Sequence, residues 1–129
     1  MLRPIHFEIH ADNLQRAIAF YTKLFGWTFT KWTGPAEYWL IKTGEAGAPG
    51  IDGGLMTRQG PAPAPMQPVN AFVCTIDVTD LDDAMRRTAE LGGKIVIPKI
   101  SIPAVGWLTY ANDIEGNTFG MMQMDAAAR

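Results

Sequence analysis

The chain contains an internal repeat in which a short strand pattern runs directly into the start of a helix. The first copy covers residues 5–14 and the second covers residues 72–81. At one constant offset, similar residues meet along both copies and the helices that follow: Ile9 with Ile76, Asn13 with Asp80, Leu14 with Leu81, Ala17 with Ala84, Leu24 with Leu91, and Gly26 with Gly93. A repeat of this length is typical of two copies of one supersecondary unit.

The first half predicts one strand, one helix and three further strands. Residues 5–10 alternate between polar and apolar types, and from Leu14 to Phe25 apolar residues recur every three or four positions, which predicts a helix over about 13–25. Asp12 is expected to cap that helix, with Gln15 as its capping-box partner and Gly26 as the stop. The remaining strands are predicted at 27–32, 37–43 and 51–58.

The second half repeats this order after a connector that is rich in proline. A strand is predicted at 70–77, a helix that starts at Thr79 or Asp80 and ends before Gly92, and strands at 94–97, 107–112 and 118–124, with the tail 125–129 frayed. The sequence therefore predicts an α+β protein of two βαβββ modules in one domain over 1–129. Module one covers about 1–58, the connector 59–68 and module two about 69–125.

Composition narrows the function classes. Of the 129 residues 47% are hydrophobic and 19% charged, which is typical of a folded protein, and the net charge of -2 with scattered basic residues disfavours nucleic-acid or membrane partners. No apolar stretch is long enough to span a bilayer and no signal peptide is recognised, so a cytoplasmic location is expected. Cys74 lies in an apolar run and is expected to be a buried, inert thiol.

The two copies differ most in the polar residues of their first strand. Alternation places His6, Glu8 and His10 on one face of the first strand. The corresponding face of the second copy carries Val73, Thr75 and Asp77. The chemistry of the protein is therefore expected to depend on the first copy.

Several segments together resemble the vicinal oxygen chelate superfamily, which includes glyoxalase I, bleomycin-resistance proteins and extradiol dioxygenases. The matching segments are the strand-to-helix opening 6–14, the helix segment 16–21 with Phe25-Gly26-Trp27, and the turn 113–117. The resemblance implies paired modules whose curved, mixed eight-stranded sheet encloses a ligand cavity, and commonly a homodimer. The connector 59–68 allows the modules to pair within one chain or between two chains.

Enzymes of this superfamily usually hold one divalent metal with four side chains. Carried over by position, those places are occupied here by His6, Gly54, Val73 and Gly120, of which only His6 can bind a metal. Since a catalytic ion needs about three protein ligands, no cofactor is expected. The alternative is a divalent metal bound by His6 and a neighbour in its row, but residues two apart on a strand are separated by about 6.5–7 Å, so all three on one ion would require distortion.

The residues of the row have structural and functional interpretations. His6 is either a hydrogen-bonded imidazole that lines a cavity or a metal ligand, and His10 is expected to be partly exposed near the helix start. Glu8 is a candidate general base or polar anchor for a ligand; otherwise it pairs with an arginine or with backbone groups across a subunit boundary. Most aromatic residues are expected in the core, among them Trp27, Trp32, Tyr38, Tyr110 and Phe119, whereas Trp39 and Trp107, which correspond in the two modules, are predicted to line the pocket.

These observations predict a protein that binds a small aromatic or amphipathic molecule through His6, Glu8, Trp39 and Trp107 and lacks the usual metal centre. The alternative is an enzyme of the lyase, isomerase or dioxygenase type, with a rearranged metal site or metal-free acid–base chemistry at Glu8. A module that serves mainly in protein interaction is the third hypothesis, and it requires a cavity filled by the protein's own side chains.

Overall fold

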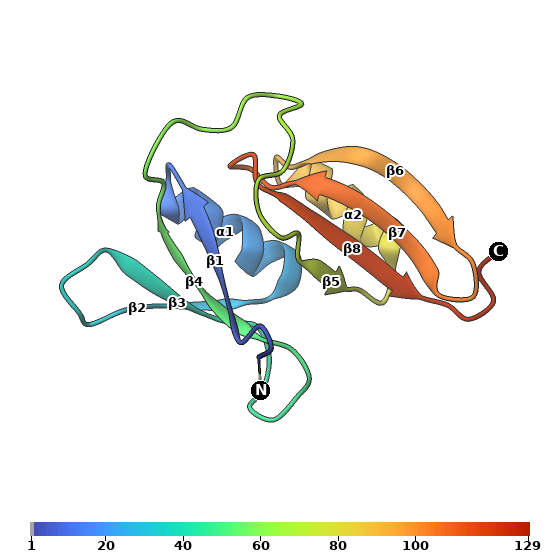
Figure 1. Cartoon of the computed structure of the whole chain (residues 1–129), viewed down its shortest axis with the longest axis horizontal. Helices are drawn as coiled ribbons and strands as arrows, with labels where there is room; N and C mark the ends of the chain where they lie inside the picture. Colours follow the sequence, from blue (N-terminus) through green and yellow to red (C-terminus); the bar gives the residue numbers. More distant parts are fainter. Residues whose placement is uncertain (1) are drawn as a thin grey trace. The chain divides into compact units, whose positions relative to one another are not determined.

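The structure, a computed structural model, describes residues 2–129 and divides the chain into two compact units (Figure 1). The first unit ends at Ala62 and the second is Pro63–Arg129. The first contains β1 (His6–Ala11), α1 (Leu14–Phe25), β2 (Thr28–Lys31), β3 (Tyr38–Lys42) and β4 (Asp52–Thr57). The second contains β5 (Thr75–Asp77), α2 (Leu81–Glu90), β6 (Lys94–Ile102), β7 (Gly106–Asn112) and β8 (Thr118–Met124). The predicted α+β class with two βαβββ modules is confirmed.

Each unit forms its own four-stranded mixed sheet, and the two sheets have the same strand order. The order is β1-β4-β3-β2 in the first and β5-β8-β7-β6 in the second. In each sheet the first strand pairs in parallel with the last, and the other pairs are antiparallel. The internal repeat of the sequence is therefore also a repeat of topology.

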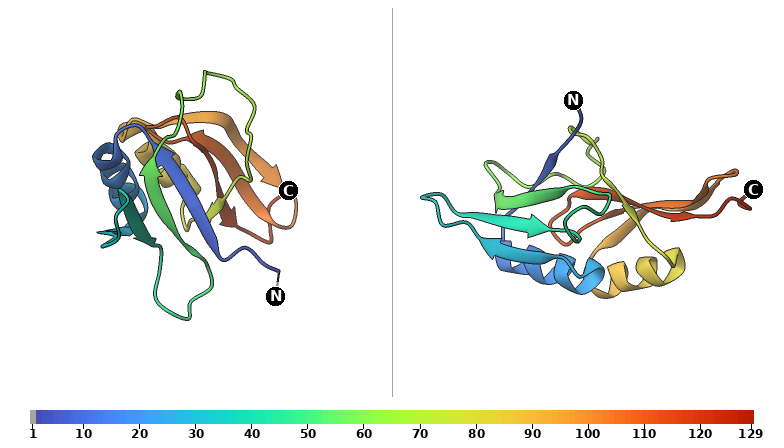
Figure 2. Two further views of the ribbon diagram at one scale, coloured as in Figure 1. Left: turned by 60° about the vertical axis from the view of Figure 1, so that its left-hand side comes forward. Right: turned by 90° about the horizontal axis from the view of Figure 1, so that it is seen from below.

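In each unit a helix covers one face of the sheet (Figure 2). In the first unit, α1 buries one apolar stripe against the sheet residues Ile41 and Leu55, which are at most 2% exposed. The buried residues of that stripe are Ala17, Phe20, Tyr21 and Leu24. Trp27 follows α1 and stacks on Tyr21, with 5.1 Å between ring centroids and 5° between planes. Because strand residues alternate, the opposite face of this sheet carries the other half of the side chains.

The second unit packs in the same way. Leu81, Ala84 and Thr88 of α2 are buried, as are Ala111 of β7 and Met121 of β8. The hydroxyl of Thr88 donates to the Ala84 carbonyl oxygen at 2.7 Å, so this polar group is satisfied inside the core.

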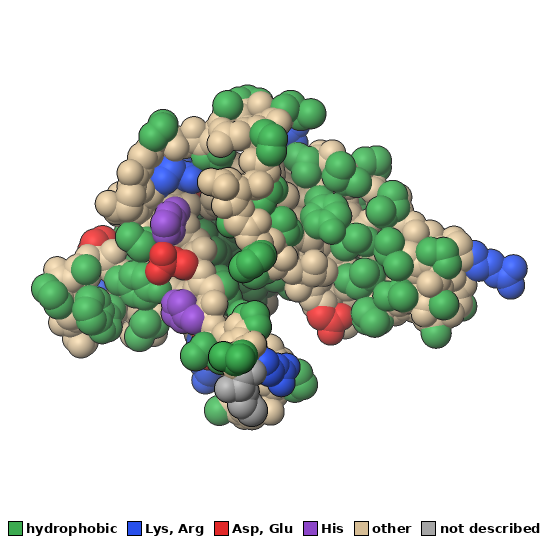
Figure 3. All heavy atoms as spheres, viewed as in Figure 1, with side chains coloured by type: hydrophobic (Ala, Val, Ile, Leu, Met, Phe, Trp, Pro, Cys, Tyr) green, Lys and Arg blue, Asp and Glu red, His purple; other side chains and the backbone are tan. Residues whose placement is uncertain are grey.

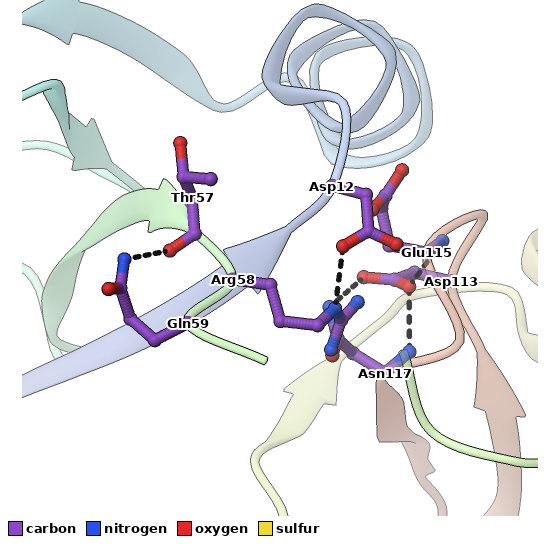
Figure 4. Close-up of polar contacts among 7 residues, drawn as sticks. All are labelled: Asp12, Thr57, Arg58, Gln59, Asp113, Glu115 and Asn117. Atoms are coloured by element: carbon purple, nitrogen blue, oxygen red, sulfur yellow. Dashed lines mark hydrogen bonds and ion pairs between the residues drawn. The ribbon is translucent and has the colours of Figure 1, made fainter. Parts of the chain in front are cut away.

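The ends of the helices agree with the prediction at Asp80 and Gly26 and differ at the start of α1. Asp80 caps α2, and Gly26 ends α1 in the left-handed conformation, with φ of 74°. The cap of α1 is Asn13, whose side chain accepts from the Arg16 N–H at 3.0 Å, and not Asp12. Asp12 instead forms an ion pair with Arg58 at 3.2 Å (Figure 4).

Two strands have different limits from those predicted. The strand expected at 70–77 is reduced to β5, so Cys74 lies outside it and is exposed, and the prediction of a buried thiol was wrong. In contrast, β6 continues through Pro98 to Ile102. Register shifts between Ile95 and Ile97 and between Ile97 and Ile100 make this possible, because proline is tolerated in a strand at such irregularities.

The C-terminal tail is partly anchored. Ala128 is 4% exposed, and its carbonyl oxygen accepts from the Ala104 N–H at 2.9 Å. The prediction of a frayed tail was therefore wrong for this residue. From Leu2 to Arg129, no helix is long and apolar enough to cross a membrane.

The capping assignment leads to a stability prediction. We expect Asn13→Ala to lower the free energy of unfolding by about 1 kcal/mol, because it removes the acceptor for the Arg16 N–H. The control is Gln15→Ala on the exposed face of the same helix, which is expected to change stability by much less. Chemical denaturation followed by circular dichroism measures both. An equal loss for the two variants would contradict the assignment.

Candidate functional site

The face of the first sheet that lies opposite α1 carries the polar row predicted from the sequence. His6, Glu8 and His10 alternate along β1 with residues that point towards the helix. The chain has two histidines, and Figure 3 shows both on one face with an acidic side chain between them. In the register with β4, Glu8 is opposite Gly54 and His10 is opposite Met56.

Tyr38 of β3 joins this row into a continuous chain of hydrogen bonds. Its hydroxyl donates to Glu8 Oε2 at 3.2 Å and lies 2.8 Å from His6 Nε2. On the other side of the carboxylate, His10 Nε2 is 2.8 Å from Glu8 Oε1. An ionised carboxylate only accepts hydrogen bonds, and the phenol has one proton, so both imidazoles donate from Nε2 in this network. The order along the chain is His6, Tyr38, Glu8, His10.

The hydroxyl of Tyr38 can reach the row because residue 54 is glycine. Glu8, Gly54 and Leu40 are aligned across three neighbouring strands. A Cβ atom added at Gly54 would lie 1.7 Å from the Tyr38 hydroxyl oxygen, which is less than any van der Waals contact allows. The phenol therefore occupies the space that a side chain at position 54 would need.

An apolar hollow of about 250 Å³ adjoins the polar row on the same unit. It is lined by Trp32, Ala36, Tyr38 and Leu40. The rings of Trp32 and Tyr38 meet edge to face, 6.4 Å apart and at 80°. A Cβ atom added at Gly34 would lie 2.2 Å from the Trp32 ring, so this aromatic side chain also lies over a glycine. Tyr38 belongs to both parts of the site, since its ring lines the hollow and its hydroxyl joins the row.

Hydrogen bonds favour the ionised form of Glu8. The hydrogen bond from His10 contributes most to lowering the pKa of Glu8; partial burial opposes this, and the Tyr38 hydrogen bond lowers it further. Burial and the neighbouring Glu8 carboxylate raise the pKa of Tyr38, so its phenol stays protonated. At neutral pH the centre of the row is thus a carboxylate that receives hydrogen bonds from both sides.

The two tryptophans predicted for the pocket lie on the helix side of their sheets. Trp39 shares its face with Ile41 and Leu55, so the structure does not bring it to the face of Glu8. The prediction chose the wrong phase of alternation in β3, where Tyr38 and Leu40 point to the polar row. The sequence predicts Tyr38 and Trp32 in the core, whereas both line the hollow.

Trp107, in the second unit, shares its face with the buried residues Thr109 and Ala111. Its indole Nε1 donates to Asp125 Oδ2 at 3.1 Å, and the Lys99 ammonium lies 5.2 Å from the ring centroid. These contacts occupy the polar atom and one face of the indole. Trp107 therefore contacts Asp125 and Lys99 of the second unit and is not part of the polar row.

The second unit repeats the arrangement of a tyrosine over a glycine without the polar row. A Cβ atom added at Gly120 would lie 2.9 Å from Thr75 Oγ1 and 3.2 Å from a ring carbon of Tyr110. Thr75 stands where the first unit has Glu8, opposite the glycine of the last strand. The carboxylate is therefore specific to the first module.

The turn 113–117, which carried part of the family resemblance, is built by side-chain-to-backbone hydrogen bonds. Asp113 Oδ1 accepts from the N–H groups of Glu115 and Asn117 at 2.8 and 2.9 Å, and Oδ2 accepts from the Asn117 amide at 3.1 Å (Figure 4). This pattern fixes the β7–β8 hairpin. Asp113 and Asn117 thus have a structural role in the turn.

Residues 3–121 match the family model of the Glyoxalase/Bleomycin resistance protein/Dioxygenase superfamily. The chain belongs to this superfamily. No curated protein matches the chain. Several solved structures share the fold, and at these identities they show the fold alone.

Three of these structures illustrate the match. The fosfomycin resistance protein FosX from Listeria monocytogenes superposes with a TM-score of 0.73 at 12% identity, covering 97% of this chain and 93% of that one. TioX from Micromonospora sp. ML1 gives 0.66 at 16% identity, covering 95% and 99%. A glyoxalase-related enzyme from Fulvimarina pelagi gives 0.69 at 16% identity, covering 100% and 98%.

Members of this superfamily include metal-dependent proteins, but the residues here do not fit the usual divalent ion. The four positions carried over from the family are His6, Gly54, Val73 and Gly120, and only the first has a metal-binding side chain. The Nε2 atom of His6 bonds to Tyr38, and the space beside Gly54 is filled by the same phenol. Within residues 2–129 no group of three histidine, cysteine or acidic side chains could hold an ion.

The hydrogen-bond chain predicts how Glu8 titrates. We expect Tyr38→Phe to raise the pKa of Glu8 towards its ordinary value of 4.5, because the variant removes a donor to the charged form. Since the folded pKa of Glu8 is depressed, its contribution to stability is present above the unfolded pKa and is lost as pH falls through the folded pKa. In the variant the folded pKa of Glu8 lies closer to its unfolded pKa, so the pH range over which this contribution to stability is lost should be narrower.

Carboxyl carbon chemical shifts followed by NMR from about pH 2 to 7 measure this titration. Tyr110→Phe is the control, because it removes a tyrosine hydroxyl from the second unit, where Thr75 and not a carboxylate is opposite the glycine of the last strand. An unchanged Glu8 titration in Tyr38→Phe would rule out the hydrogen bond as a cause of the shift.

Proposed function

We propose that the protein binds a small amphipathic molecule on the polar and apolar face of its first module, without a metal ion. The observation that carries this proposal is the position of Tyr38, whose hydroxyl fills the space of a side chain at Gly54 and bonds to His6 and Glu8. The Tyr38 hydroxyl thus occupies the space of a metal ligand of the family and bonds to His6, the one metal-binding side chain at the four positions. It also donates a hydrogen bond to Glu8.

The combination of a hollow and a polar row supports a ligand with two chemically different ends. Small-molecule sites are concave and mostly apolar, with few polar groups that fix orientation. Here the hollow would take an apolar body, while Glu8 and its neighbours bind a polar group. Tyr38 contributes to both parts of the site, so one ligand could contact the hollow and the polar row together.

The ligands of the structural relatives do not transfer directly. One FosX structure holds Mn(II) and a dihydroxypropylphosphonic acid. In this chain the candidate site of the first module presents the Glu8 carboxylate. A phosphonate would meet a like charge there, with no metal ligand set to offset the repulsion. We therefore do not extend phosphonate binding to this protein.

Substitution at Gly54 tests the proposed site. With a library of small aromatic and amphipathic fragments, we expect NMR shift changes to cluster on Glu8, Trp32, Tyr38 and Leu40. Gly54→Ala should abolish them, because the added methyl group displaces the Tyr38 hydroxyl. Gly44→Ala is the control, since a Cβ atom there meets nothing within 4 Å. Tyr38→Ala in the Gly54→Ala background separates lost folding from lost binding, because it relieves the clash.

The same samples, titrated with zinc and manganese, test whether the site works without a metal. Metal-independent binding predicts no stoichiometric uptake at micromolar concentrations. One tightly bound ion that depends on His6 would overturn the proposal and favour the alternative, an enzyme with a rearranged metal site. Fragment binding elsewhere on the chain, unaffected by Gly54→Ala, would also overturn it.

We also propose that the protein is a homodimer in the cytoplasm. Large apolar side chains that are exposed in the single chain support association: Ile5, Met66 and Phe72 are 83%, 96% and 102% exposed. Burial of these side chains against a partner would remove apolar surface from water, which is favourable. We expect light scattering after size-exclusion chromatography to give twice the chain mass. Phe72→Ser should shift the mass towards that of one chain, whereas a single-chain mass for the unmodified protein would refute the dimer.

A further inference from the structure

We propose that the ligand of this face carries a protonated nitrogen, as in an amine or amidine, attached to an aromatic or other apolar body. This inference rests on the proposed function and names the chemical class that the same site selects. Three features of the first module support it: an accessible carboxylate, two aromatic rings that line the hollow, and the absence, within residues 2–129, of a lysine or arginine paired with the carboxylate.

The Glu8 carboxylate keeps capacity to accept further hydrogen bonds. Each of its oxygens receives one hydrogen bond, Oε2 from Tyr38 and Oε1 from His10. An ionised carboxylate has about four lone-pair directions, so each oxygen can accept one more donor. The side chain is 42% exposed, which leaves room for a ligand group to approach.

The charge of Glu8 is not offset by lysine or arginine in the described chain. Among the ion pairs of residues 2–129, the one that includes Glu8 is with His10. Two basic side chains of the first unit have acidic partners of their own: Lys31 pairs with Glu37 at 3.3 Å, and Arg58 with Asp12 at 3.2 Å. A charged donor from a ligand would therefore gain a charge-assisted hydrogen bond, which is about twice as strong as a neutral one.

The aromatic pair next to the carboxylate favours the same class of ligand. Trp32 is 41% exposed and contacts the Tyr38 ring edge to face, so the two rings present surfaces at about a right angle. A cation is attracted to the face of an aromatic ring within about 6 Å of its centroid. Both rings lie over glycines, Gly34 and Gly54, which fixes their positions before any ligand arrives.

Three probes of nearly equal size separate the charge classes: phenethylamine, 2-phenylethanol and 3-phenylpropanoate. They are titrated into the full chain at about pH 8, where an alkylammonium is protonated and imidazole is ordinarily neutral. NMR shifts of the Trp32 indole N–H report binding. We expect the amine to bind about tenfold more tightly than the alcohol, and the carboxylate to bind most weakly. Raising the salt concentration from about 20 mM to about 300 mM should reduce the preference for the amine.

Glu8→Gln tests the origin of the preference. The variant keeps the shape of the side chain but removes its charge, so the amine should lose its tenfold advantage over the alcohol. Glu37→Gln is the control, because it removes one charge from the ion pair with Lys31 near the hollow and leaves the row intact. It should preserve the preference. If Glu8→Gln does not fold, the salt dependence of the unmodified protein still gives the answer.

The outcomes distinguish this inference from the proposed function. Equal binding of the amine and the alcohol at the Trp32 site, without salt dependence, overturns the cationic class but leaves small-molecule binding at this face intact. Tighter binding of 3-phenylpropanoate than of phenethylamine overturns the inference, because the site would then prefer an anion. If none of the probes shifts the Trp32 signal, and neither does the fragment library, both the proposed function and this inference fail.

Discussion

The contact between the Tyr38 phenol and the backbone at Gly54 determines the character of the whole candidate site. A glycine inside a strand weakens it, because it adds backbone entropy to the unfolded chain and has no side chain to pack. In β4 the ring of Tyr38 covers that position, and its hydroxyl lies where a Cβ atom would come within 1.7 Å. The same absence of a side chain removes a metal ligand and admits a hydrogen-bond donor. A metal-binding side chain at position 54 and the Tyr38 hydroxyl would occupy the same space, so the protein can have one or the other.

The two modules show how chemistry can differ on one backbone plan. Both sheets have the same strand order, and in both a tyrosine of the third strand lies over a glycine of the fourth. The first strand differs at the position opposite that glycine, where the first module has Glu8 and the second has Thr75. The third strand also differs, because Tyr110 is directly opposite Gly120, whereas Tyr38 is two residues from Leu40, which is opposite Gly54. The two modules therefore share one topology, whereas only the first has a charged side chain opposite the glycine. Function has to be argued from that local site, because the fold alone does not specify it.

The sequence predicted the elements and the polar row but not the aromatic part of the site, for a physical reason. Alternation along β1 is unambiguous because His6, Glu8 and His10 are polar and their neighbours are not. In β3 the run Tyr38-Trp39-Leu40-Ile41 is apolar on both faces, so alternation gives two sets without indicating which one faces the helix. The position of Tyr38 depends on a non-local contact with Gly54, which no pattern within one strand reveals. Likewise, β6 passes Pro98 only because of register shifts.

The direction of the hydrogen bonds determines which groups of the row remain available to a ligand as donors or acceptors. Because Glu8 can only accept, Tyr38 donates to it, and His6 must donate from Nε2 to Tyr38. In a neutral imidazole that leaves Nδ1 of His6 as an acceptor. The network therefore uses its donors internally, and its remaining capacity at Glu8 and His6 is for accepting. A ligand bound by this row needs to supply hydrogen-bond donors, which an ammonium or amidinium group does and a phosphonate or carboxylate does not.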